Sequence, residues 1–309
     1  MTRIAQSAYL SSVNAALPRV LSLFDTNPIS ASKGVGDRYR WAWKGRDFAN
    51  GSFQGAVHGL AWLVSNDLLP PHISQNTIIK RIEEIISGTR VITHDDGSLD
   101  EILPLESSYC VTALVAFDIL SALRLLGQHL SASTRDEHVE TVRPLISFIQ
   151  RAREHHGVIT NHMAAGAGAL ALWQATTGEN VASSLDSTVS LIKKHYSSEG
   201  WFLEYQGADP GYQSLALDYL TVLDELAPEY ELLPLLLQAT DFLRYMAHPD
   251  GSFGGLYGSR NTRFLYPAGI EALVSHSGAA TSLAAFSRMA HFQTSTVGLL
   301  AMDLSLIHI

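Results

Sequence analysis

Apolar residues recur at helical spacing along most of the chain. The segment from Val111 to Leu126 contains only Asp118 and Arg124 as charged residues, so a helix there would be buried over most of its surface. A second apolar stripe at the same spacing consists of Tyr212, Leu215, Ala216, Tyr219, Leu220 and Leu223. No comparable run of alternating β-branched residues occurs, and the glycine-rich stretches are single turns. The pattern therefore predicts an all-α fold.

A short glycine turn recurs between the predicted helices. Its five copies are Asn50-Gly51-Ser52-Phe53, Asp96-Gly97-Ser98-Leu99, His156-Gly157-Val158-Ile159, Glu199-Gly200-Trp201-Phe202 and Asp250-Gly251-Ser252-Phe253. The glycines lie roughly 50 residues apart, which leaves room for two helices of ordinary length and their connections. Glycine accepts positive φ in such turns, and the apolar residue two positions later can anchor the turn. Each repeat is therefore predicted to be one helical hairpin.

Five to six such hairpins can stack as a solenoid or close into an α/α toroid. The helix after Asn161, MAAGAGALALW, is small and apolar almost all round, as a helix enclosed by neighbours should be. This favours the toroid for residues 1–303, incomplete or just closed. In a toroid the five turns would gather around one mouth, and the aromatic and acidic loop from Glu199 to Pro210 would face the same cavity.

Composition excludes several classes of function. The chain has 309 residues, 46% of them apolar, and a net charge of −9 from 17% charged residues, which argues against broad contacts with nucleic acid. The single cysteine, Cys110, excludes an internal disulfide framework or a thiolate zinc cluster, and it is expected to be a buried, inert thiol. No cofactor is expected.

The sequence shows neither a signal peptide pattern nor a membrane-spanning pattern. The N-terminus has no sustained apolar segment ending in a small-residue cleavage site, so we expect no signal peptide and a cytoplasmic location. The longest run without Asp, Glu, Lys or Arg, Gly157 to Gly178, is interrupted by Asn161, His162 and Gln174 and is a poor membrane span.

The last six residues, LSLIHI, resemble the translation of a sequencing-library adaptor. We therefore expect Leu304 to Ile309 to be foreign to the natural chain, to contact little of the fold, and to replace a natural continuation past Asp303. An ordinary apolar tail is the alternative.

Three segments carry a resemblance to a known family. They are the Asn161-His162 pair, the Pro210-Gly211-Tyr212 helix entry and the Gly258-Ser259-Arg260-Asn261-Thr262 element. Together, over roughly residues 90 to 275, they resemble the toroid half of the heparinase II/III-like polysaccharide lyases. The resemblance implies an acidic, uronic-acid-containing polysaccharide or oligosaccharide as partner, and a β-sandwich domain following the toroid. Thr160 stands where many of these lyases carry a second Asn.

The same residues can be interpreted without the family. Thr160 is a plausible N-cap, which would place Asn161 and His162 in a first helical turn where free backbone N–H groups favour an anion such as a sugar carboxylate. A local capping role for Asn161 and a core imidazole bonded to backbone for His162 are the alternatives.

The loop before the next helix offers further contacts. Tyr212 is expected to direct its hydroxyl to the cavity, with core packing as the alternative. Asp209 and Glu204 could hold sugar hydroxyls, although helix capping is favoured for Asp209 because Pro210 follows. Flat rings that could stack on sugars are Trp201, Phe202 and Tyr205, with core packing of one or two of them as the alternative.

Charged residues complete the candidate set. Arg260 and its neighbour Asn261 lie in a glycine-rich turn where a guanidinium can bind a carboxylate, and an ion pair with Glu271 or Asp250 is the alternative. A separate acidic patch is interpreted as solvated surface rather than as a metal site; it consists of His94, Asp95, Asp96, Glu101, Glu106 and Tyr109.

Three functions remain open. A lyase could use Asn161 and Arg260 on the carboxylate, His162 as base and Tyr212 as acid, without a metal. A toroid glycoside hydrolase needs two flanking carboxyl groups, for which the candidates are Glu204, Asp209, Glu106 and Asp96. A non-catalytic toroid could bind glycan or act as a scaffold, and Thr160 in the place of an Asn keeps this reading open.

Overall fold

The computed structural model describes residues 3–152, 154 and 157–293. Over these residues the chain forms helices joined by loops, and the only β-pairings there are isolated bridges between single residues. The α-helices are α1 (Arg3–Ser22), α2 (Arg38–Trp41), α3 (Ala56–Ser65), α4 (Gln75–Ile92), α5 (Tyr109–Leu125), α6 (Ala132–Arg151), α7 (Thr160–Thr177), α8 (Ala182–Lys194), α9 (Pro210–Leu226), α10 (Leu233–Leu243), α11 (Ala268–Ala272) and α12 (Gly278–Gln293). Short 3-10 helices are η1 (Gly51–Gly55), η2 (Gly127–His129), η3 (Pro228–Tyr230) and η4 (Arg244–Met246). The predicted all-α class is confirmed.

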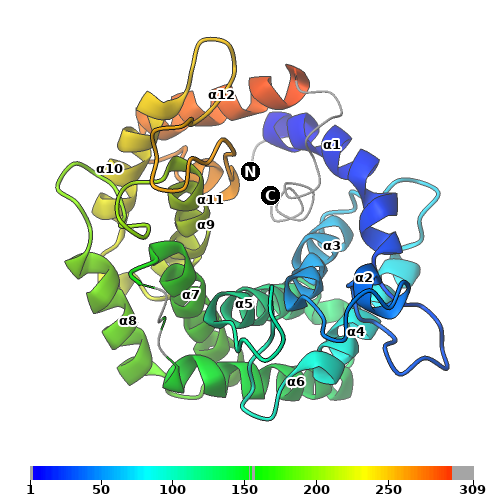
Figure 1. The fold of residues 1–309 in the computed structure, drawn as a ribbon. Helices are drawn as coiled ribbons and strands as arrows, with labels where there is room; N and C mark the ends of the chain where they lie inside the picture. The colour runs from blue at the N-terminus through cyan, green and yellow to red at the C-terminus, as the bar shows by residue number, and fades with distance from the viewer. Residues whose placement is uncertain (1–2, 153, 155–156, 294–309) are drawn as a thin grey trace. The chain divides into compact units, whose positions relative to one another are not determined.

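The described chain divides into two compact units. We call residues 13–152 the N-terminal unit, and residues 3–12 together with 154 and 157–293 the C-terminal unit. In the N-terminal unit α3 and α5 lie side by side, α4 packs on α3, and α6 packs on both α4 and α5 (Figure 1). The C-terminal unit repeats this order, because α7 packs on α9, α8 on α7 and α10 on α9. The helical hairpin repeat is therefore present in both units.

Side-chain size explains the position of α7. Thirteen of its residues are buried, and most of them are Ala or Gly, which allow the neighbouring helix α9 to approach closely along its length. Its largest side chain, Trp173, is 1% exposed and donates its indole N–H to Glu179 just beyond the end of the helix. The enclosed helix predicted from MAAGAGALALW is confirmed.

The repeated turns share a hydrogen-bond pattern. In the copies at Asn50, Asp96 and Asp250, the side-chain Oδ1 accepts the N–H of the serine two residues later at 2.9 Å and also accepts its hydroxyl. Gly97 and Gly251 adopt φ values of +85° and +86°. A Cβ on Gly97 would lie 2.1 Å from the carbonyl oxygen of Pro144, so only glycine fits there. The gathering of all five turns on one rim stays a prediction.

Buried glutamines connect two of these turns to the helices α4 and α10. Gln54 donates to the carbonyl of Ile85 in α4 at 2.8 Å, and Gln213 donates to the carbonyl of Ala239 in α10 at 2.9 Å. Both glutamines are 0% exposed, so each amide satisfies backbone groups that water does not reach.

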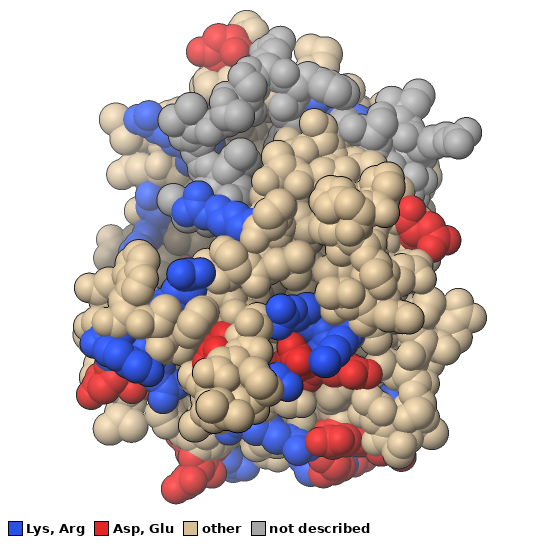
Figure 2. Space-filling model, turned by 90° about the vertical axis from the view of Figure 1, so that its right-hand side faces the viewer, with Lys and Arg blue, Asp and Glu red and all other residues tan. Residues whose placement is uncertain are grey.

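Other sequence expectations have mixed outcomes. Cys110 is half-buried rather than buried, because its side chain leaves the otherwise buried first turn of α5 on a partly exposed side. The tail from Leu304 to Ile309 lies outside the described residues. No helix among the described residues is long and apolar enough to span a membrane. Figure 2 shows basic and acidic side chains interspersed over one face, with no extended area of positive charge.

Candidate functional site

The start of α7 is tied to the loop before α9. α7 begins at Thr160, and Ile159 is its N-cap, so the predicted cap by Thr160 is wrong. The Thr160 hydroxyl donates instead to the carbonyl of Leu203 at 2.8 Å, and its backbone N–H reaches the same oxygen at 3.2 Å. Because one carbonyl accepts both groups, the first turn of α7 is positioned by the neighbouring loop.

The carboxyl group of Glu204 lies at the start of α7, where the sequence predicted that a sugar carboxylate would bind. The backbone N–H of Asn161 donates to Glu204 Oε1 at 2.8 Å, and Asn161 Nδ2 donates to Oε2 at 2.7 Å. Glu204 is 0% exposed and Asn161 is 3% exposed. The N–H groups at a helix start favour such a partner, and here the protein supplies it. A direct contact of either side chain with substrate would require these bonds to be exchanged.

Burial sets the protonation state of Glu204. It is the main cause that raises the pKa of this carboxyl group, the nearby charge of Asp209 adds to it, and the resulting pKa is about 8. The two hydrogen bonds from Asn161 favour the ionised form but do not outweigh burial. At neutral pH the contact is therefore mainly between a neutral carboxyl group and a carboxamide.

Asp209 joins the start of α9 to the loop at residues 258–262. Its Oδ1 accepts the N–H of Tyr212 at 3.3 Å, its Oδ2 accepts the N–H of Arg260 at 2.8 Å, and the hydroxyl of Thr262 also donates to Oδ1. Thr262 Oγ1 in turn accepts the N–H of Gly211 at 2.8 Å. Asp209 is 0% exposed, and the predicted capping role is confirmed. Both of its oxygens are bound to protein groups rather than turned to solvent.

Ser259 connects the Glu204 and Asp209 segments. Its hydroxyl donates to the carbonyl of Glu204 at 2.6 Å, and its N–H donates to the carbonyl of Ala208 at 2.9 Å. Through Glu204, Asp209 and Ser259, the backbones that carry Asn161, Tyr212 and Arg260 belong to one hydrogen-bonded network. The structure thus brings together elements that lie far apart in the sequence.

Tyr212 lies in the first turn of α9 and is half-buried. Its ring meets Phe264 edge to face, with ring centroids 5.8 Å apart and an interplanar angle of 87°. Phe264 makes a similar contact with Tyr266 at 5.2 Å. This aromatic row fixes the direction of the Tyr212 ring, because T-shaped pairs are favoured by the charge distribution of the rings.

Arg260 is exposed and lies over an aromatic ring. Its Cζ is 4.4 Å from the centroid of Tyr205, a cation–π contact. The alternative ion pairs are wrong, because Glu271 pairs with Arg288 and Asp250 binds Ser252 in its own turn. Within the described residues no carboxylate pairs with the Arg260 guanidinium, which therefore keeps its donors available.

Tyr205 and Asn261 adopt left-handed backbone conformations, with φ of +63° and +56°. Such conformations cost a non-glycine residue of the order of 1 kcal/mol or more and persist where the surroundings impose them. Here the surroundings are the network of Glu204, Asp209 and Ser259. The strain lies in the loops that carry Arg260 and the ring beneath it.

His162 forms a pair that sequence reasoning missed. Its Nδ1 lies 2.6 Å from Oε2 of Glu154, and the two side chains are 14% and 4% exposed. A carboxylate can only accept, so Nδ1 carries the proton and Nε2 of the neutral ring keeps its lone pair. The alternative of a core imidazole bonded to backbone is wrong. Glu154 has no motif around it that could have identified it from the sequence.

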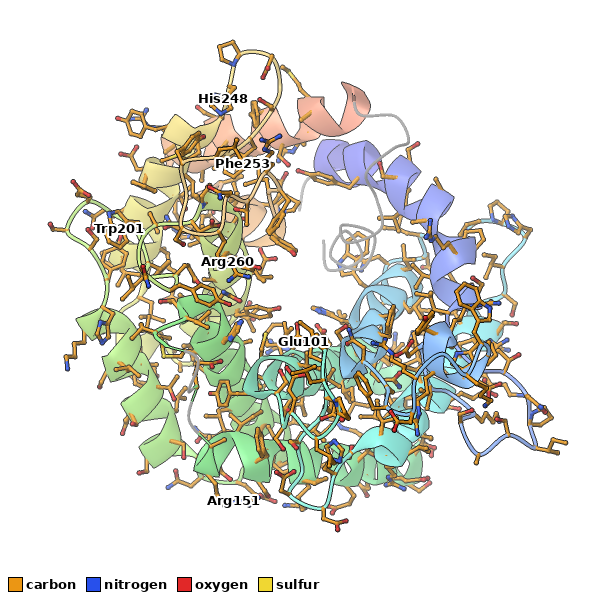
Figure 3. The ribbon with its side chains drawn as sticks, viewed as in Figure 1. Glu101, Arg151, Trp201, His248, Phe253 and Arg260 are labelled. Atoms are coloured by element: carbon orange, nitrogen blue, oxygen red, sulfur yellow. The ribbon has the colours of Figure 1, made fainter. Side chains whose placement is uncertain are left out.

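Trp201 and Asn261 were also predicted to contact substrate. Trp201 donates its indole N–H to Glu199 at 2.9 Å. Figure 3 shows Trp201 near the ends of α8 and α10, and Arg260 further in, near α9. Asn261 is exposed beside Arg260.

Acidic side chains of the patch in the N-terminal unit bind backbone N–H groups of their own loop. Glu106 accepts the backbone N–H groups of Ile102 and Leu103, both at 2.7 Å. Asp100 accepts those of Leu105 and Glu106 at 3.0 and 2.9 Å. Within the described residues no group of three or more His, Cys, Asp or Glu side chains is arranged to hold a metal ion.

Comparison with solved structures identifies proteins that share the fold of this chain. A sugar epimerase from a ruminal bacterium matches with a TM-score of 0.60 at 11% identity, over 92% of this chain and 85% of that one. Xanthan lyase from Paenibacillus matches with a TM-score of 0.55 at 9% identity, over 98% of this chain and 31% of that one. A glycosidase in complex with glucose matches more weakly, with a TM-score of 0.39 at 9% identity over 99% of both chains. No family model and no curated protein matches the sequence.

The epimerase and the xanthan lyase are α/α-toroid proteins, so the chain has the α/α-toroid fold. The sequence identities to these structures are too low to assign their activities to this chain. The chain also spans less than a third of the xanthan lyase, whose remaining parts have no counterpart here.

Proposed function

We propose that the protein acts on uronic-acid-containing glycan by β-elimination, in the manner of the heparinase II/III-like lyases. The observation that carries the proposal is the contact between His162 Nδ1 and Glu154, which places the lone pair of the partly buried neutral ring on Nε2. Within the described residues nothing binds that Nε2. An oriented imidazole of this kind is suited to removing a weakly acidic proton.

Arg260 is proposed to hold the uronate carboxylate. Its guanidinium offers two parallel N–H donors, and Tyr205 supports its plane from one side. Neutralising the carboxylate makes the C5 proton more acidic and stabilises the enolate-like intermediate. Asn161 assists through its contact with Glu204, which keeps the adjoining loop in place.

Elimination then needs one base and one acid. His162 Nε2 takes the proton from C5, and the electrons of the C5–H bond form the C4=C5 double bond as the C4–O bond breaks. The Tyr212 hydroxyl gives its proton to the departing oxygen and is reprotonated from solvent, and His162 Nε2 releases the proton from C5 to solvent. The products are an unsaturated sugar and a new chain end.

The substitutions His162→Ala and Tyr212→Phe test this mechanism. With polyglucuronate, polygalacturonate and alginate as substrates, we expect the parent to produce near-ultraviolet absorbance on at least one, and each variant to lose at least about 100-fold in rate. His276→Ala and Tyr245→Phe alter exposed side chains of the same types in the same unit and should retain the parent rate.

Other outcomes would replace the proposal. Reducing ends without unsaturation would support a glycoside hydrolase. Deuterium entering the sugar from heavy water without chain cleavage would indicate epimerisation, and binding of these polymers without any turnover would support a glycan-binding scaffold.

A further inference from the structure

A cleft lies in the N-terminal unit, apart from the candidate site residues discussed above. Its volume is about 350 Å³, within the range of small-molecule sites. It opens between α2, the end of α4 and the loop that follows. The lining residues that matter here are Arg40, Asp47, Phe48, His94, Asp100 and Leu105.

Two opposite charges in this cleft have no partners. Within the described part of the chain, the side chains of Arg40 and Asp47 take part in no hydrogen bond or ion pair. Their neighbour Arg46 behaves differently, because it pairs with the buried Asp37 at 2.5 Å and lies over the ring of Phe48 at 4.9 Å. The cleft thus presents an unused guanidinium donor and an unused carboxylate acceptor.

A histidine and an aspartate form another part of the lining. His94 Nε2 lies 3.0 Å from Asp100 Oδ1, with the two side chains 29% and 5% exposed. The carboxylate of Asp100 also accepts the backbone N–H groups of Leu105 and Glu106, so its charge is compensated by the protein. His94 Nε2 itself makes no hydrogen bond with any described residue, so it remains a polar atom in the lining of the cleft.

The wall formed by residues 100–107 is held in shape before any ligand binds. Glu106 and Asp100 bind its backbone N–H groups, and Leu105 and Ser107 are held at φ of +57° and +51°. Leu105 is 80% exposed although it is apolar. A strained and internally bonded loop of this kind is typical of binding sites rather than of simple connections.

We propose that this cleft binds a neutral pyranose unit of a glycan. Vicinal hydroxyls both donate and accept, so one sugar can satisfy Arg40 and Asp47 together, while Phe48 and Leu105 cover its apolar face. An acidic sugar would find Arg40 but would meet the charge of Asp47. The inference is independent of catalysis in the C-terminal unit.

The test uses methyl glucoside and methyl glucuronoside as probes in saturation-transfer NMR with the whole chain. We expect the glucoside to bind and Arg40→Met or Asp47→Asn to weaken it about tenfold or more, because each substitution removes a charge-assisted hydrogen bond. Two controls should bind as the parent does: Arg90→Met, whose arginine pairs with Glu137 outside the cleft, and Asp136→Asn at an exposed aspartate.

His162→Ala should also leave glucoside binding unchanged, which separates this cleft from the proposed catalytic site. Absence of saturation transfer to the glucoside would overturn the proposal. So would binding that survives both cleft substitutions in variants with parent-like circular dichroism, or tighter binding of the glucuronoside than of the glucoside.

Discussion

At the scale of single residues, Glu204 shows how two effects compete over one carboxyl group. Two hydrogen bonds from Asn161 favour its ionised form, whereas complete burial favours the neutral form, and burial is the larger effect. An unfolded chain exposes the same carboxyl group to water, where its pKa returns to its usual value of 4.5. The protonation state of Glu204 is therefore linked to folding.

This linkage predicts a pH dependence of stability. Below pH 4.5 both states are protonated, and between 4.5 and about 8 only the unfolded state is mainly ionised, so Glu204 makes stability fall as the pH rises through this window. Its contribution to the slope is at most about 1.4 kcal/mol per pH unit. Urea unfolding of the parent and of Glu204→Gln at several pH values measures it.

The Gln variant should lack this part of the slope, whereas Glu140→Gln at an exposed site should keep it. An unchanged slope in Glu204→Gln would show that Glu204 is ionised in the folded protein.

At the scale of elements, the Asp209 side chain both caps α9 and binds the neighbouring loop. Asp209 caps the helix and binds the backbone and hydroxyl groups of the loop at residues 258–262. The helix start and the loop are therefore coupled, and the positions of Tyr212 and Arg260 depend on the same carboxylate.

Asp209→Ala should lower the free energy of unfolding by about 2–4 kcal/mol. The loss combines a helix cap with buried donors left without an acceptor. Asp209→Asn keeps one acceptor oxygen and should cost less. Chemical denaturation measures both variants.

Asp241→Ala, at a half-exposed ion pair with Arg244 in the same unit, serves as the control and should change stability by less than about 1 kcal/mol. A similarly small effect of Asp209→Ala would mean that other groups or water replace the carboxylate.

At the scale of the whole molecule, the C-terminal unit is discontinuous in sequence, because the first residues of α1 belong to it. Tyr9 is 2% exposed, and its hydroxyl donates to Glu271 Oε1 at 3.1 Å and contacts Ser287 Oγ at 3.2 Å. Arg288 binds the same glutamate through two nitrogens. The first helix of the chain is thereby joined to its last described hairpin, α11 and α12.

Tyr9→Phe should lower the free energy of unfolding by about 1–2 kcal/mol, because the buried Glu271 and Ser287 lose a partner. Thermal unfolding measures the change, and Tyr39→Phe at an exposed ring should have almost no effect. Equal stability of Tyr9→Phe and the parent would show that the hydroxyl does not contribute to joining the two ends.

The sequence alone determined the helices, their pairing into hairpins and the chemistry of the turns. These features depend on neighbours within a few residues: the periodicity of α5 and α9, the small residues of α7, and the Asp-Gly-Ser order whose side chain binds its own backbone. Asp209 before a proline was likewise recognisable as a cap.

Only the tertiary structure decided which partner each site residue has. Glu204 rather than a ligand meets the start of α7, Glu154 orients His162, and Arg260 lies over Tyr205 instead of pairing with an acid. Each choice depends on which loops the packed helices bring together. A polar side chain bonds to the nearest suitable group in space, and the order of residues along the chain does not contain that distance.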